Sequence, residues 1–325
     1  MGSFIISLDF ELLWGVRDSR GSEYHKQLLN VHKVVPHILS LFERYGIACT
    51  WATVGALCVS SEEELYELKP TATPTYDDSI YSPYENLDTM LALDPRMFFA
   101  SRLVQQIVHT PKQELASHTF CHYYCLEKGQ SIEQFKADLN SNLNAVKKFN
   151  TKLKSLVFPR NQFNKNYLSA CKELGIICYR GNPEHWAYRA ESRNDKGNSF
   201  RRIFRLLDSY LPLSGSLQQK PTLDLESSMI NIPASLFLRP FSKRLFFLEP
   251  IRLWRIKWSM TQAAKNGGVF HLWWHPHNFG SNLEENFSFL EEILKHYKYL
   301  NCRYGFDSIT MENKATDFLI RKGVN

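Results

Sequence analysis

The segment Glu114-Leu115-Ala116-Ser117-His118-Thr119-Phe120-Cys121-His122 places two histidines four residues apart, directly after a short apolar run. At this spacing the two imidazoles can reach one ion whether the chain forms a helical turn or a loop at a strand end. Imidazole suits Zn, Fe, Co or Ni, and a catalytic site needs one more protein donor if other positions stay open. The spacing therefore predicts a metal site in which a carboxylate supplies the further protein ligand.

Two other interpretations of this segment are open. In a chain with eleven histidines, such a pair can be a coincidence or a satisfied polar pair. Cys121 and Cys125 could instead complete a structural zinc site, but on a helix Cys121 would turn away from the face that the other three side chains share. We therefore predict that both cysteines lie outside the site.

Length and composition indicate a globular protein. The 325 residues are 44% hydrophobic and 14% aromatic, which supports a substantial core. Seven cysteines without regular spacing favour a reducing compartment. The apolar run Phe4-Ile5-Ile6-Ser7-Leu8 meets Asp9 at once, so no secretory signal is seen, and nowhere do 18 apolar residues run together. We expect a cytoplasmic protein without a membrane span, with peripheral contact at the inner face of the membrane left open.

The order of the apolar runs predicts a parallel α/β fold. Six runs are typical of buried strands: residues 3–8, 47–54, 114–117, 155–158, 176–180 and 269–274. Helical patterns between most of them favour right-handed strand-helix-strand units. The alternation breaks from about residue 182 to 242, which predicts a large insertion before the last motif of a single domain spanning residues 1–325.

Polar side chains follow several of these strands. They are Asp9 and Glu11, then His118 and His122, then Arg160, and finally His275 with His277. Each alone could cap a helix, form a surface ion pair or line an aromatic wall. In a parallel barrel the strand ends meet at one mouth, so their joint occurrence favours a site.

Four segments resemble, in the right order, motifs of the polysaccharide deacetylase family with the NodB homology domain. They are Ile6-Ser7-Leu8-Asp9-Phe10-Glu11, Ser117-His118-Thr119-Phe120-Cys121-His122, Phe158-Pro159-Arg160 and Val269-Phe270-His271-Leu272-Trp273-Trp274-His275. The sequences of these motifs look most like those of family members encoded with surface-polysaccharide genes, such as the genes for O-antigen or capsule. The resemblance, which is to carbohydrate esterase family 4, implies a distorted (β/α)7 barrel, one divalent metal and hydrolysis of an N-acetyl or other acyl group from an amino sugar.

The resemblance also implies roles for individual residues. Asp9 matches the base, His118 and His122 the metal ligands, Arg160 the arginine that holds the base, and His275 the acid. The metal is expected to be Zn²⁺, with Co²⁺, Ni²⁺, Fe²⁺ or Mn²⁺ as alternatives. The expected substrate is an N-acetylated sugar, either nucleotide-linked or lipid-linked.

The first motif departs from the family pattern of two adjacent aspartates, the second of which binds metal. Successive strand residues point to opposite faces, so Asp9 and Glu11 can share a face. We predict Glu11 as the third metal ligand, with Asp9 as the alternative, and His277 as the rival acid to His275. This departure also leaves open an inactive barrel that acts as a carbohydrate-binding or interaction protein.

The net charge of +6 is concentrated in one part of the chain. From Phe200 to Trp258, ten Lys or Arg stand against four acids, which suits an anionic ligand, a membrane surface or simply a solvated face. Within this block Phe200, Ile203, Phe204 and Leu207 share a helical face, which is predicted to dock onto the barrel rim. Arg201, Arg202 and Arg205 are then expected to project outward and help bind a phosphate-bearing substrate. No recognisable nucleic-acid module is seen, so no nucleic-acid partner is expected.

Overall fold

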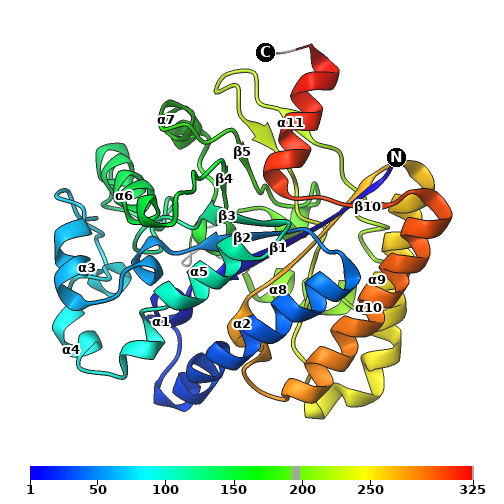
Figure 1. The fold of residues 1–325 in the computed structure, drawn as a ribbon, viewed down its shortest axis with the longest axis horizontal. Coiled ribbons are helices and arrows are strands. Elements are labelled where there is room, and N and C mark those ends of the chain that lie inside the picture. Colours follow the sequence, from blue (N-terminus) through cyan, green and yellow to red (C-terminus); the bar gives the residue numbers. More distant parts are fainter. Residues whose placement is uncertain (191, 193–197, 324–325) are drawn as a thin grey trace.

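The computed structural model describes residues 1–190, 192 and 198–323. A curled β-sheet lies at the centre of the molecule (Figure 1). Its strands are β1 (Ser3–Phe10), β2 (Cys49–Thr53), β3 (Gln113–Ser117), β4 (Ser155–Leu156), β5 (Cys178–Tyr179), β6 (Thr222–Leu223), β7 (Ile230–Asn231), β8 (Leu236–Phe237), β9 (Val269–Trp274) and β10 (Asp307–Ser308). Their order is β6-β7-β5-β4-β3-β2-β1-β9-β8, and β10 pairs with β1. The first strand therefore lies between β2 and β9, parallel to both.

The short segment that carries β7 and β8 joins the two ends of the parallel sheet. β7 pairs with β5 and β8 pairs with β9, in both cases in parallel. Between them, the N–H of Ile232 donates to the Tyr179 carbonyl at 2.9 Å, and the N–H of Ser235 donates to the His271 carbonyl at 2.8 Å. With this segment counted once, seven parallel positions form the ring within the described residues, and the predicted distorted (β/α)7 barrel is confirmed.

The segment predicted as an insertion contains this closing strand. Residues 182–242 include β7 and β8, so the part outside the ring ends before Ile230. β6 pairs with β7 in antiparallel fashion. The strand escaped prediction because its two paired pieces are only two residues long each, and such short runs show no recognisable period.

Helices cover the outside of the sheet (Figure 1). They are α1 (Leu12–Val16), α2 (His25–Tyr45), α3 (Glu62–Leu68), α4 (Leu87–Leu91), α5 (Ser101–His109), α6 (Ile132–Ala145), α7 (Leu168–Glu173), α8 (Asn198–Asp208), α9 (Glu249–Asn266), α10 (Leu283–Tyr304) and α11 (Met311–Lys322). Gly46 ends α2 with φ 67°, and Ser131 with Gln134 forms a capping box at the start of α6. Among the described helices, none has both the length and the apolar composition that crossing a bilayer requires.

Glu114 connects the C-terminal helix to the sheet. Its carboxyl group accepts hydrogen bonds from Thr50 Oγ1 at 2.6 Å, from the backbone N–H of Glu312 at 3.2 Å and from Ser155 Oγ. Burial nevertheless raises the pKa of Glu114 to about 7 because the charged form loses its hydration. This joint between β3 and α11 therefore titrates near neutral pH.

The basic helix α8 buries less of its apolar face than predicted. Phe200, Ile203 and Leu207 are 67%, 57% and 49% exposed, and we call these three side chains the apolar stripe. Arg205 is partly buried instead and donates a hydrogen bond to the Ala187 carbonyl at 3.1 Å. The predicted docking is wrong for these three side chains, whereas the half-buried Phe204 of the same predicted face packs against His185 and Trp186. Periodicity identifies which residues share a face but not how much of that face turns inward.

Candidate active site

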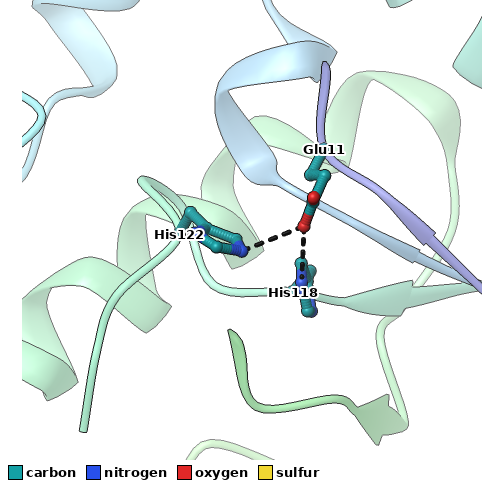
Figure 2. Close-up of side chains that lie close together, drawn as sticks. All are labelled: Glu11, His118 and His122. Atoms are coloured by element: carbon teal, nitrogen blue, oxygen red, sulfur yellow. Dashed lines mark ion pairs between the residues drawn. The ribbon is translucent and has the colours of Figure 1, made fainter. Parts of the chain in front are cut away.

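Three of the predicted ligands meet at the ends of β1 and β3. Figure 2 shows Glu11, His118 and His122 pointing towards one another. Glu11 Oε2 lies 3.4 Å from His118 Nε2 and 3.0 Å from His122 Nε2. All three side chains are buried, and one ligand atom of each lies within 4.8 Å of the others. The structure thus brings together the carboxylate and the two imidazoles that the sequence singled out.

The loop after β3 fixes the direction of both histidines. Thr119 and His122 each have φ 62°, a left-handed conformation that costs residues other than glycine about 1–3 kcal/mol. The Asp138 carboxylate of α6 offsets this cost by accepting hydrogen bonds from the N–H groups of Phe120 at 2.6 Å and Cys121 at 3.1 Å. A helix outside the barrel therefore holds the strained loop that turns the imidazoles inward.

The polar atoms of this group fit a cation. His118 Nδ1 lies 2.8 Å from the Val157 carbonyl and donates to it, so the other ring nitrogen, Nε2, is the one that faces Glu11. That Nε2 is buried and has no hydrogen-bond partner, and burial lowers the pKa of His122 to about 4. Burial would raise the pKa of Glu11, but the neighbouring imidazoles of His275 and His122 hold it well below its ordinary value. One carboxylate and two imidazoles are a donor set for a divalent metal.

Asp9 lies beside these ligands and is paired with an arginine. Arg180 Nη1 donates to Asp9 Oδ1 at 2.6 Å and Nη2 to Oδ2 at 2.7 Å. Burial would raise the pKa of Asp9, but the charge of Arg180 outweighs it and lowers this pKa below its ordinary value. The guanidinium also donates to Ser7 Oγ at 2.9 Å and Asn161 Oδ1 at 2.8 Å, and it lies 4.3 Å from the Trp273 ring centre. Asp9 is thus held ionised and in one orientation.

Arg160 does not hold the candidate base, contrary to the prediction. Among the described residues its ion pair is with the buried Asp18, and its guanidinium lies 4.2 Å from the Tyr124 ring centre. Arg160 sits in a turn after β4 with φ 55°, whereas Arg180 directly follows β5 and reaches Asp9. The sequence carried the needed signal, since Arg180 ends an apolar run in the same way that Asp9 does.

Two histidines after β9 complete the cluster. His275 Nε2 lies 3.8 Å from Asp9 Oδ2 and 3.7 Å from Glu11 Oε1, with 22% of its side chain exposed. His277 Nε2 lies 3.9 Å from Glu11 Oε1, but this ring is buried. Burial, with repulsion from His275, lowers the pKa of His277 to about 3. A neutral imidazole is a much weaker acid than an imidazolium, so the low pKa of the buried His277 favours the partly exposed His275 as the acid.

Cys121 and Cys125 lie in the hydrophobic core. Within the described part of the chain, neither belongs to a group that could bind metal. Burial raises the pKa of both thiols well above the ordinary value, so both keep their protons and are poor metal ligands. Their place outside the site stays a prediction that metal analysis can test.

Comparison with known proteins gives these residues a context. Residues 24–179 match the family described as polysaccharide deacetylase. A Mycobacterium smegmatis protein assigned as a polysaccharide deacetylase has a TM-score of 0.61 and 11% identity, over 99% of this chain and 92% of that one. A Pseudomonas aeruginosa PAO1 protein with the same assignment gives 0.56 and 10%, over 99% and 91%. The Puue allantoinase gives 0.56 and 10%, over 98% and 89%. No curated protein matches the chain by sequence.

At these identities the likeness to solved structures shows the fold alone. The family match contains His118 and His122, whereas Asp9 and Glu11 precede it and His275 follows it. These last three residues are therefore tied to the site by the geometry of the barrel.

Proposed function

Since residues 24–179 place this chain in the polysaccharide deacetylase family, we propose that it is a metal-dependent hydrolase that removes an N-acetyl, or another acyl group such as formyl, from an amino sugar. One observation carries the proposal: the Glu11, His118 and His122 group lies beside a carboxylate held by an arginine and a partly exposed imidazole. In metal-assisted amide hydrolysis, the first group binds the metal, the carboxylate accepts a proton and the imidazole donates one.

Glu11, His118 and His122 are the residues that would hold one divalent ion. We propose Zn²⁺ first, with Co²⁺, Ni²⁺, Fe²⁺ or Mn²⁺ as alternatives, because nitrogen and oxygen donors accept all of these metals. When bound, such an ion supplies Lewis-acid polarisation of the acyl carbonyl and acidification of water. Asp9 is not needed as a ligand, since both of its oxygens accept hydrogen bonds from Arg180.

Asp9 and His275 handle the protons in this proposal. Asp9 takes a proton from the attacking water, because Arg180 keeps the carboxylate ionised and oriented. As the carbonyl carbon gains the water oxygen and its bond to nitrogen breaks, His275 gives a proton to that nitrogen. The products are the free carboxylic acid and the amine. Such general acid or base help contributes about 10²–10⁴-fold to the rate.

We further propose that the sugar belongs to a surface polysaccharide such as O-antigen or capsule and is carried on a nucleotide or a lipid. The proposed location is the cytoplasm, with peripheral contact at the inner face of the membrane. The apolar stripe of α8 supports this contact, since exposed apolar side chains on a basic helix suit the interface of an anionic bilayer.

The direct test measures metal content and acid release together. The purified protein is expected to bind one divalent ion and to release acetate or formate from an N-acylated amino sugar. Asp9→Asn should keep the metal and lose at least about 100-fold in kcat, as expected for removal of a general base. Glu11→Gln should weaken metal binding, because it removes the ionised donor.

Different outcomes separate the alternatives. Metal loss in Asp9→Asn with metal retained in Glu11→Gln would mean that the two carboxylates have exchanged roles. Full metal occupancy and sugar binding without acid release from any acylated amino sugar would favour the carbohydrate-binding alternative over the enzyme.

A further inference from the structure

A cavity of about 480 Å³ opens beside the candidate active site. Part of its wall is formed by Asn161 and Trp273, which both contact the Arg180 guanidinium. Another part is formed by the cavity arginines, which we define as Arg160, Arg189, Arg202, Arg205 and Arg239. None of the described residues that line the cavity is acidic. Its wall therefore carries concentrated positive charge close to the reacting groups.

Most of the cavity arginines have no carboxylate partner among the described residues. Arg160 pairs with Asp18, but no ion pair within residues 1–190, 192 and 198–323 involves the other four. Buried arginines elsewhere in the same region are paired, as Arg252 is with Glu249 and Arg255 is with Asp208. Within the described residues, the fold thus neutralises Arg252 and Arg255 and leaves four of the five cavity arginines without a counter-charge.

The cavity arginines also repel one another. Burial lowers the pKa of Arg205, and the like charges of Arg202 and Arg201 lower it further. Burial lowers the pKa of Arg239 as well, with a further contribution from Arg205. Like charges gathered in a partly buried site raise the free energy of the free protein, and a bound anion relieves this repulsion.

Aromatic side chains connect this positive wall to the acid. Trp273 and Phe237 line the cavity, and their ring centres lie 5.7 and 5.8 Å from that of His275. Flat apolar faces combined with a few polar groups are typical of small-molecule sites. A ligand that spans the cavity can therefore contact both the arginines and the candidate active site.

We propose that the cavity arginines bind a phosphate or diphosphate group of the substrate, while its sugar lies against Trp273 and Phe237 with the acyl group next to His275. Guanidinium forks match phosphate oxygens and form strong charge-assisted hydrogen bonds. The acyl end of this arrangement rests on the proposed function, whereas the anion site rests on the arginines alone. Nucleotide and lipid carriers share this phosphate chemistry.

The first test measures binding of inorganic diphosphate to the full chain by titration calorimetry, which needs no catalysis. Arg202→Gln with Arg239→Gln should weaken binding by roughly 10–100-fold, the range expected for lost hydrogen bonds between charged groups. The matched control is Lys243→Gln with Arg244→Gln, which removes the same charge from exposed positions outside the cavity. This control should bind diphosphate like the wild type.

The second test compares three substrates: N-acetylglucosamine linked to uridine diphosphate, the same sugar linked to polyprenyl diphosphate, and a neutral N-acetylated oligosaccharide. The cavity variant, Arg202→Gln with Arg239→Gln, should raise KM by roughly 10–100-fold for the preferred phosphate-linked substrate. Its KM for the neutral oligosaccharide should stay unchanged. The preferred carrier identifies the source of the phosphate. If the double variant does not fold, Arg202→Gln alone, at an exposed position, provides the same comparison.

Equal diphosphate affinity in the wild type and the cavity variant would overturn the anion site, as would equal weakening in the surface control. Intact diphosphate binding without hydrolysis of any acylated sugar would leave the anion site standing and count against the proposed function. The two inferences can therefore fail separately.

Discussion

Replacing Arg180 by methionine tests how the candidate base is held. The Arg180 side chain is fully buried and that of Asp9 is 4% exposed, so the substitution leaves a carboxylate in the protein interior without its cation. Removing one partner of a buried ion pair costs about 3–5 kcal/mol. We expect the free energy of unfolding to fall by this amount and the pKa of Asp9 to rise, since only His118 and His275 then oppose the effect of burial.

A double-mutant cycle separates the ion pair from general damage. Asp9→Asn in the Arg180→Met background removes the unpaired charge, so the double variant should be more stable than Arg180→Met alone. The coupling free energy between the two positions should be at least about 2 kcal/mol, as for other directly hydrogen-bonded charges. Urea unfolding of the metal-free protein, followed by tryptophan fluorescence, measures all four variants.

Arg160 provides the matched comparison, because it is an arginine near the site whose partner is Asp18. The same cycle between Asp9 and Arg160 should give a coupling below about 0.5 kcal/mol, as expected for residues without a direct contact. A coupling for Arg180 as small as this, or an equally large coupling for Arg160, would refute the assignment of Arg180 as the residue that orients the base.

Three further predictions concern the metal, the sheet and the membrane. His118→Ala with His122→Ala should lose the metal in elemental analysis because one remaining donor binds it weakly, whereas Cys121→Ser with Cys125→Ser should retain it. Glu114 has a folded pKa of about 7 against an ordinary 4.5, so the folded chain holds a proton that the unfolded chain releases, and stability should fall as pH rises from about 4.5 to 7. The loss amounts to about 3 kcal/mol, and Glu114→Gln should remove this slope from unfolding curves measured across that range. Replacing the apolar stripe by serine should reduce co-sedimentation with anionic vesicles by at least about tenfold, because most of the apolar area that would enter the bilayer interface is lost. The free energy of unfolding should change by no more than about 1 kcal/mol, since these side chains are exposed.

The ring of strands and most of the cluster could be predicted because both depend on simple periodicities. Apolar runs of strand length identified the long strands, and the period of two placed Asp9 and Glu11 on one face. Parallel strands then bring their carboxyl ends together, so His118 and His275 could be expected near these carboxylates. The structure brings all four side chains to one place.

The remaining features depend on contacts between distant segments, which no local pattern encodes. The turn at Arg160 has a left-handed backbone, and its side chain follows the partner that tertiary packing offers. The choice of face on α8 likewise depends on the cavity arginines and their neighbours. The closing strand, split into two short pieces, is recognisable only through the hydrogen bonds it makes to β5 and β9.

The central position of β1 affects the order in which the protein assembles during synthesis. Ser7 and His271, which share a hydrogen bond between β1 and β9, lie 264 residues apart in the chain. At about 5–20 residues per second, translation needs roughly 13–50 s to cover this distance, and one edge of the apolar β1 stays open to wrong pairing meanwhile. Glu11, His118 and His122 all leave the ribosome well before that edge is covered. The nascent chain therefore carries its whole candidate donor set for a metal before His275, the candidate acid, has been made.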